Sequence, residues 1–114
     1  MVAPPRPPPD VCRVVVIDDF EADYVIARKF LERAGYEVHW ARSFESGLTK
    51  IAEGDAAAYL VDYGLGARSG VELIEEARQR GSTAPLVLLT RMGSVEVDTA
   101  AARVGATCHG AYTR

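Results

Sequence analysis

The sequence predicts an α/β fold in which helices cover both faces of a parallel β-sheet. Short apolar segments that fit buried strands alternate four times with segments whose apolar residues recur at helical spacing. The first of these segments, residues 14–17, is apolar at every position, which is typical of a strand buried on both faces. Repeated strand–helix–strand units require right-handed crossovers, so we expect a doubly wound sheet.

Two strand–helix pairs are predicted in the first half of the chain. After the strand at residues 14–17, apolar residues recur at helical spacing from Ile26 to Ala34, and Gly35 should end that helix. Residues 36–40 follow as a second strand. Ser43 should cap a second helix that ends at Gly54.

The second half repeats this pattern. Residues 57–61 should form a third strand, and Ser69 and Glu72 a capping box for a helix that ends at Gly81. Residues 86–89 read as a fourth strand, before a last helix that begins at Ser94 and is closed by Gly105. Residues 107–112, TCHGAY, stand where a fifth strand belongs, although they make a poor strand sequence.

Composition limits the class of protein. Five of the six prolines lie in residues 1–9, so we expect a flexible, proline-rich leader before one domain at residues 10–114. A formal charge of -3 argues against nucleic-acid and membrane-surface binding. No apolar run of about 20 residues and no secretory signal occurs, which favours a cytoplasmic protein. Cys12 and Cys108 form no ligand pattern and should be free thiols.

Acidic and hydroxyl residues directly follow three of the predicted strands. Asp18 and Asp19 follow the first, Asp62 the third and Thr90 the fourth. Sites in open α/β sheets form at the carboxyl ends of the strands, so these side chains should converge. Neighbouring carboxylates repel each other, and a hard divalent cation such as Mg²⁺ would neutralise them. With this cation a carboxylate can attack phosphorus, which predicts phosphoryl transfer to an aspartate.

Four segments together resemble the receiver domains of bacterial two-component response regulators. They are VVVIDDFEADY, AYLVDYGLGARSGVELI, PLVLLTRMG and AARVGAT, in the order of the family, and the resemblance covers about residues 12–107. It implies a flavodoxin-like sheet with strand order 2-1-3-4-5. It also implies a signalling module that is not an enzyme, and that receives a phosphoryl group from a sensor histidine kinase or a phosphotransfer protein.

The resemblance assigns roles to the residues at the strand ends. Asp62 would be the phosphoacceptor, and Thr90 the switch hydroxyl that closes on the phosphoryl group. Asp19 would ligate Mg²⁺ directly and Asp18 through water. Asp62 and the Gly64 carbonyl would complete the metal ligands.

Several features bear on how closely the chain follows this family. Gly70 stands in the turn before the third helix, where the family tolerates a side chain poorly. Arg91 replaces a small residue, and the family's aromatic switch position falls on His109. The lysine that pairs with the phosphoryl group is replaced by Tyr112. The chain stops at Arg114, so we expect the last helix to be missing.

Two alternatives remain open. The replaced lysine and Arg91 favour a pseudo-receiver, an interaction module that does not signal by phosphorylation. An enzyme is disfavoured, because Gly64 stands where an aspartate-based phosphatase needs its second carboxylate, and because an acidic first loop would repel a flavin phosphate. In either case the missing helix should expose apolar sheet surface, through which the chain would form a homo-oligomer or bind another protein.

Overall fold

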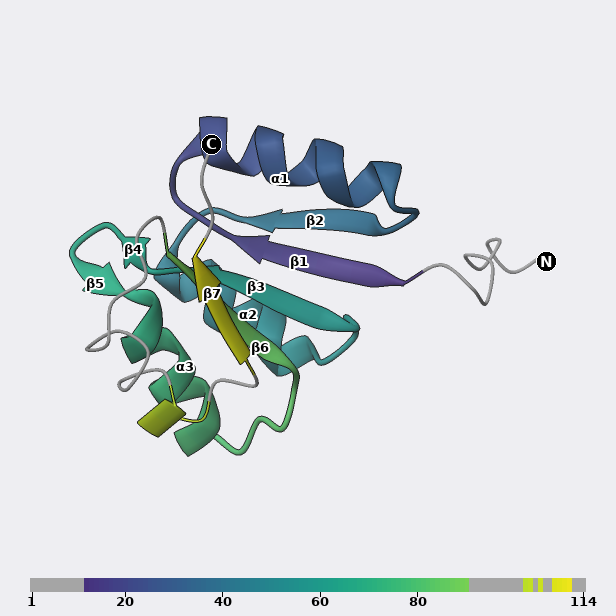
Figure 1. Ribbon diagram of the computed structural model, residues 1–114. Coiled ribbons are helices and arrows are strands. Elements are labelled where there is room, and N and C mark those ends of the chain that lie inside the picture. The colour runs from purple at the N-terminus through teal and green to yellow at the C-terminus, as the bar shows by residue number, and fades with distance from the viewer. Residues whose placement is uncertain (1–11, 91–101, 104, 106–107, 112–114) are drawn as a thin grey trace, which may run out of the picture.

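The computed structural model describes residues 12–90, 102–103, 105 and 108–111 (Figure 1). In these residues five parallel strands form one sheet in the order β2-β1-β3-β6-β7. The strands are β1 (Arg13–Ile17), β2 (Glu37–Ala41), β3 (Ala58–Asp62), β6 (Leu86–Thr90) and β7 (Cys108–Ala111). The predicted order 2-1-3-4-5 is confirmed, because β6 and β7 are the fourth and fifth strands of this sheet.

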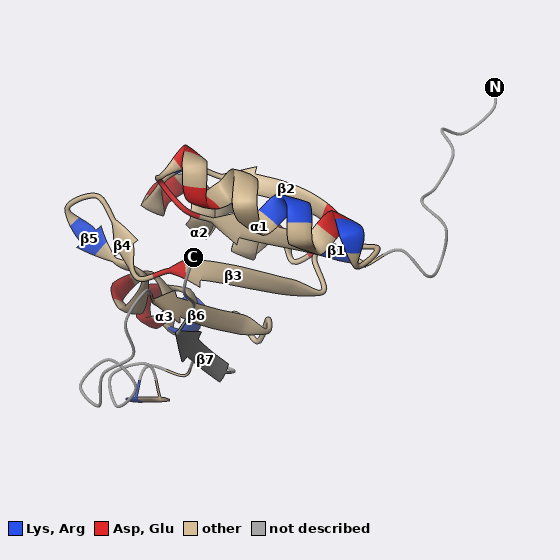
Figure 2. Ribbon diagram, turned by 45° about the horizontal axis from the view of Figure 1, so that its top comes forward, with Lys and Arg blue, Asp and Glu red and all other residues tan. Residues whose placement is uncertain are grey.

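Helices lie on both faces of the sheet, as the sequence predicted (Figures 1 and 2). Helix α1 (Glu21–Arg33) covers one face, and α2 (Phe44–Glu53) and α3 (Gly70–Gln79) cover the other. The main core lies between the sheet and the two helices α2 and α3. Its fully buried large side chains are those of Ile17, Tyr59, Leu73, Ile74, Leu86 and Leu88.

The predicted helix signals are confirmed in most respects. The Ser43 hydroxyl accepts the Ser46 N–H, and the Ser46 hydroxyl accepts the Ser43 N–H, which makes a reciprocal capping box. Gly54 ends α2 in the left-handed conformation. The capping box predicted for α3 is half wrong: Ser69 accepts the Glu72 N–H, but the Glu72 carboxylate accepts a hydrogen bond from Arg68 instead.

The capping box of α2 gives a direct stability test. We expect Ser43→Ala to lower the free energy of unfolding by about 1 kcal/mol, because the Ser46 N–H at the start of α2 loses the hydroxyl that accepts it. Chemical denaturation measures this difference. Thr49→Ala is the matched control, since its exposed hydroxyl bonds only to the Glu45 carbonyl within the same helix. Equal losses in the two variants would contradict a special role for the cap.

The end of the chain is only partly described. Residues 108–111 pair in parallel with β6, despite their poor strand composition, because the ladder uses backbone groups that any residue other than proline offers. Ala102 and Arg103 are helical, within the helix predicted to begin at Ser94. The proposed leader, the rest of that helix and the three residues after β7 lie outside the described residues.

A two-stranded antiparallel hairpin, β4 (Gly64–Leu65) and β5 (Arg68–Ser69), was not predicted and lies between β3 and α3. Cys12 is an exposed free thiol, as predicted, while nothing is described of the Cys108 side chain. None of the helices in the described ranges has the length and apolar character needed to cross a membrane.

Candidate functional site

Three carboxylates meet at the carboxyl ends of β1 and β3, as the sequence predicted. Asp18 and Asp19 directly follow β1, and Asp62 is the last residue of the neighbouring strand β3. Each contributes one carboxylate oxygen to a group in which all of these atoms lie within 4.8 Å of one another. Figure 2 shows the acidic end of β3 in red. This arrangement is a donor set suited to a divalent cation that prefers oxygen ligands.

Asp18 is the most buried member of the group, with 4% of its surface exposed. Its backbone is held by β2, since its N–H donates to the Ala41 carbonyl and its own carbonyl accepts the Trp40 indole N–H, at 2.8 Å. The pKa of the Asp18 carboxyl is raised to about 7, mainly by burial and also by the charges of Asp62, Asp23 and Asp19. The Phe20 N–H, which donates to Asp18 Oδ1, opposes this rise. Full ionisation of these carboxylates is therefore unfavourable when no cation is bound.

Stacked aromatic rings fix the first helix beside these carboxylates. Tyr24 of α1 and Trp40 of β2 lie with their ring centroids 4.3 Å apart and their planes 4° from parallel. The Arg42 guanidinium lies over the Trp40 ring, 4.6 Å from its centroid. Since Trp40 also bonds to the Asp18 backbone, the stack joins α1, β2 and the acidic cluster into one packed unit.

A cleft of about 300 Å³ opens beside the carboxylates. Thr90, at the end of β6, and Gly64, just after β3, line this cleft together with Asp19 and Asp62. The predicted residues are therefore neighbours in space. The exposed rings of Phe20 and Tyr63 also line it. A ligand in this cleft would lie among carboxylates, the Thr90 side chain and two aromatic rings.

Asp23 is a fourth acidic residue at the site, which the sequence analysis did not single out. It is 6% exposed, lies in the first turn of α1 and lines the same cleft as Asp19 and Asp62. Its spacing of five residues from Asp18 was a usable signal. Acidic residues are common in the first turn of any helix, however, because they interact favourably with its dipole.

Gly70 packs closely against the backbone of Asp62. It is the first residue of α3 and not part of the preceding turn, which corrects the predicted position by one element. Its N–H donates to the Tyr63 carbonyl at 2.7 Å. A Cβ atom at this position would collide with the carbonyl oxygen of Asp62. Only glycine lets the start of α3 come this close to the backbone of Asp62.

The predicted switch residue and the two unusual residues are not placed fully. His109 lies in β7, in register with Leu88 of β6, but nothing is described of its side chain. Arg91 and Tyr112 lie outside the described residues. The roles that the sequence suggested for these three residues stay predictions.

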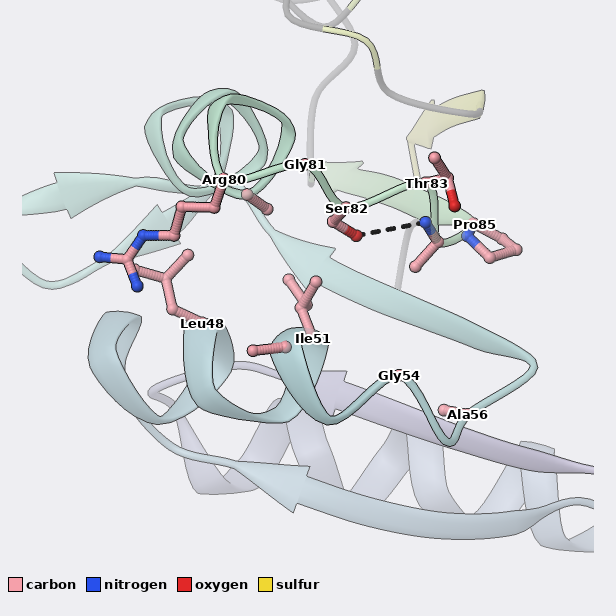
Figure 3. Close-up of a pocket in the computed structure, with 12 residues that line it drawn as sticks. Leu48, Ile51, Gly54, Ala56, Arg80, Gly81, Ser82, Thr83 and Pro85 are labelled. Atoms are coloured by element: carbon pink, nitrogen blue, oxygen red, sulfur yellow. Dashed lines mark hydrogen bonds between the residues drawn. The ribbon is translucent and has the colours of Figure 1, made fainter.

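A second cavity, of about 530 Å³, lies at the opposite end of the sheet (Figure 3). It is bounded by the last turns of α2 and α3 and by the segment that leads into β6, where the Ser82 hydroxyl accepts the Ala84 N–H. Its lining includes Leu48, Ile51 and Arg80, and the Arg80 guanidinium pairs with Glu76. None of the predicted site residues lines this cavity, so the acidic cleft is the candidate site.

Comparison with known proteins supports the same conclusion. The photosynthetic apparatus regulatory protein RegA of Rhodobacter capsulatus is 30% identical over 95 residues, which are 82% of this chain and 51% of RegA. The sensory/regulatory protein RpfC of Xanthomonas campestris pv. campestris is 29% identical over 98 residues, 82% of this chain and 14% of RpfC. The chain therefore spans about half the length of RegA and a much smaller part of RpfC.

Solved structures with the same fold include receiver proteins. The crystal structure of a response regulator from Burkholderia pseudomallei with a phosphorylated aspartic acid, a calcium ion and citrate has a TM-score of 0.79 at 28% identity, covering 90% of this chain and 61% of that one. A CheY-like receiver domain protein from Methanospirillum hungatei has a TM-score of 0.78 at 27% identity, covering 90% and 82%. Residues 14–109 match the family described as the response regulator receiver domain. With its flavodoxin-like sheet and its acidic cluster at the strand ends, this chain belongs to the receiver domains of two-component response regulators.

Proposed function

We propose that the domain accepts a phosphoryl group on Asp62, in a reaction that needs Mg²⁺, from a sensor histidine kinase or a phosphotransfer protein. The observation that carries this proposal is the group of three carboxylates, with Thr90 lining the same cleft. The relative from Burkholderia pseudomallei, whose structure contains a phosphorylated aspartic acid and a calcium ion, supports it. The phosphorylated domain would then signal through protein contacts.

The residues present fit a divalent cation. Asp19, Asp62 and the Gly64 carbonyl would bind Mg²⁺ directly, and Asp18 would do so through water. The buried Asp18 and its acidic neighbours supply the negative charge that such an ion requires. When bound, Mg²⁺ would neutralise charge on the transferring phosphoryl group.

The transfer itself would use the side chain of Asp62 as the nucleophile. One carboxylate oxygen would bond to the phosphorus of a phosphohistidine while the P–N bond breaks, and the electron pair of that bond would stay on the imidazole nitrogen. The product is an acyl phosphate on Asp62. The Thr90 hydroxyl would donate a hydrogen bond to a phosphoryl oxygen of this product.

The proposal is tested by phosphorylation with a small donor. The chain is incubated with acetyl phosphate and Mg²⁺, and its intact mass is measured. We expect one phosphoryl group on the wild-type chain, none on Asp62→Asn, and none when the divalent cation is chelated. Asp55→Asn is the matched control, because Asp55 is a half-exposed carboxylate that pairs with Arg13 just before β3. This variant should be modified like the wild type.

The outcome also separates the alternative. An adduct that persists in Asp62→Asn would contradict the assignment of the phosphoacceptor. A wild-type chain that takes no phosphoryl group would favour the pseudo-receiver, whose sequence support, Arg91 and Tyr112, lies outside the described residues.

A further inference from the structure

The β4–β5 hairpin, which connects β3 to α3, lies beside the carboxylates of the acidic cleft (Figure 1). A Cβ atom on Gly66, in the turn of the hairpin, would lie 3.9 Å from Asp19 Oδ2. One on Gly64, in β4, would lie 3.8 Å from Asp62 Oδ2. The backbone of the hairpin is therefore close to two of the three carboxylates. Its position also sets the position of the Gly64 carbonyl, which we expect to bind the cation.

Two residues that pair across the hairpin hold it to the rest of the domain. Leu65 of β4 is in register with Arg68 of β5. Leu65 is buried and belongs to the main core. The Arg68 guanidinium lies over the ring of Phe44, the first residue of α2, at 3.7 Å from the ring centroid. Because Phe44 is itself buried, this contact anchors the hairpin to a fixed part of the fold.

The same guanidinium pairs with two carboxylates of α3. Arg68 Nε donates to Glu72 Oε2 at 3.0 Å, and Arg68 Nη2 lies 3.8 Å from Glu76 Oε1. Glu76 is held in turn by Arg80, at 2.8 Å. A single half-exposed ion pair contributes little to stability, but here one planar group joins a ring of α2 to two residues of α3. Arg68 therefore ties β5 to both helices.

We propose that Arg68 is a positioning residue for the cation site, and that its contacts with Phe44, Glu72 and Glu76 hold the Gly64 carbonyl in place beside the carboxylates. This inference rests on the proposed Mg²⁺ site and adds to it a residue that does not line the cleft. Charge and position predict opposite effects of removing Arg68. Loss of a positive charge alone would strengthen cation binding, since like charges repel. Loss of the hairpin's anchor should weaken it.

Calorimetric titration of the full chain with Mg²⁺ tests the proposal. We expect Arg68→Ala to raise the dissociation constant at least about threefold, which is less than the roughly 10-fold or greater loss for a group bonded directly to a metal ligand, because Arg68 acts one step further away. Arg80→Ala is the matched control. It removes the same charge from the same network of ion pairs, at the end of α3 that lies away from the hairpin. This variant should bind Mg²⁺ at least as tightly as the wild type.

Two further measurements separate positioning from a general loss of structure. In the metal-free chain, the amides of residues 64–69 should exchange hydrogen faster in Arg68→Ala than in the wild type, while those of β1 and β3 should not. Arg68→Lys, which keeps a cation within reach of Glu72, should restore part of the Mg²⁺ affinity.

The outcomes distinguish this inference from the proposed function. Mg²⁺ binding or hairpin exchange that Arg68→Ala leaves unchanged would overturn the role of Arg68. An equal loss of affinity in Arg80→Ala, or no recovery in Arg68→Lys, would overturn it as well. A wild-type chain that binds no Mg²⁺ would instead overturn the proposed function, and this inference with it.

Discussion

Gly70→Ala is expected to destabilise the domain by about 3 kcal/mol, at the upper end of the range for an overpacked position. The added Cβ would collide with the carbonyl oxygen of Asp62 and lie 2.9 Å from Val61 Cγ1. The first of these neighbours is backbone of a central strand, which cannot turn aside as a flexible side chain would. The hydrogen bond from the Gly70 N–H to the Tyr63 carbonyl ties α3 to the same place. Chemical denaturation measures the loss.

Gly64→Ala is the matched control for this stability measurement. A Cβ at Gly64 would meet its nearest neighbour, Asp62 Oδ2, at 3.8 Å, which is an ordinary contact. We expect this variant to change the free energy of unfolding by less than about 1 kcal/mol. If the two variants were equally stable, the close approach of α3 to β3 would be wrong.

Asp18→Asn is expected to remove the loss of stability with rising pH that the Asp18 carboxyl causes in the absence of divalent cations. The Asp18 carboxyl has a pKa of about 7 in the folded domain, mainly because it is buried, against an ordinary value of 3.8. Between these values the unfolded chain releases a proton that the folded chain keeps. The folded wild type should therefore lose stability as the pH rises from about 4 to 7, by at most about 1.4 kcal/mol per pH unit from this group. Thermal denaturation at several pH values in this range measures the slope of stability against pH.

Mg²⁺ provides the reciprocal arm of this experiment. At a pH above 7 the added ion should raise the melting temperature of the wild type, because it binds the folded state and compensates the clustered charges. The gain should be smaller in Asp18→Asn, whereas Asp55→Asn should behave like the wild type in both arms. A wild-type slope equal to that of Asp18→Asn would show that Asp18 is ionised throughout this range.

The candidate site was largely predictable because it follows from topology. Once the apolar segments identify parallel strands, the residues directly after them must meet at one edge, and this brings Asp18, Asp19 and Asp62 together. Thr90 follows by the same logic from β6. The fold depends on the same strand pattern, so the sheet and the meeting of these side chains were predicted together, while their roles stay predictions.

Features that depend on side-chain competition were not predictable in this way. Glu72 has two partners within reach, the start of its own helix and Arg68, and sequence spacing does not decide between them. The β4–β5 hairpin has only two residues in each strand, too few to produce an alternating pattern. Asp23 enters the site because the Tyr24–Trp40 stack sets the position of α1, a contact between residues far apart in sequence.

That stack has an optical consequence. Trp40 is the single tryptophan of the chain, and its indole N–H is bonded to the carbonyl of Asp18, a candidate ligand of the metal. The tryptophan fluorescence of the whole protein therefore originates one hydrogen bond away from the acidic cluster, from a ring in contact with Tyr24 and Arg42. The domain contains its own spectroscopic reporter, so titrations at the acidic cluster can be followed in the unlabelled chain.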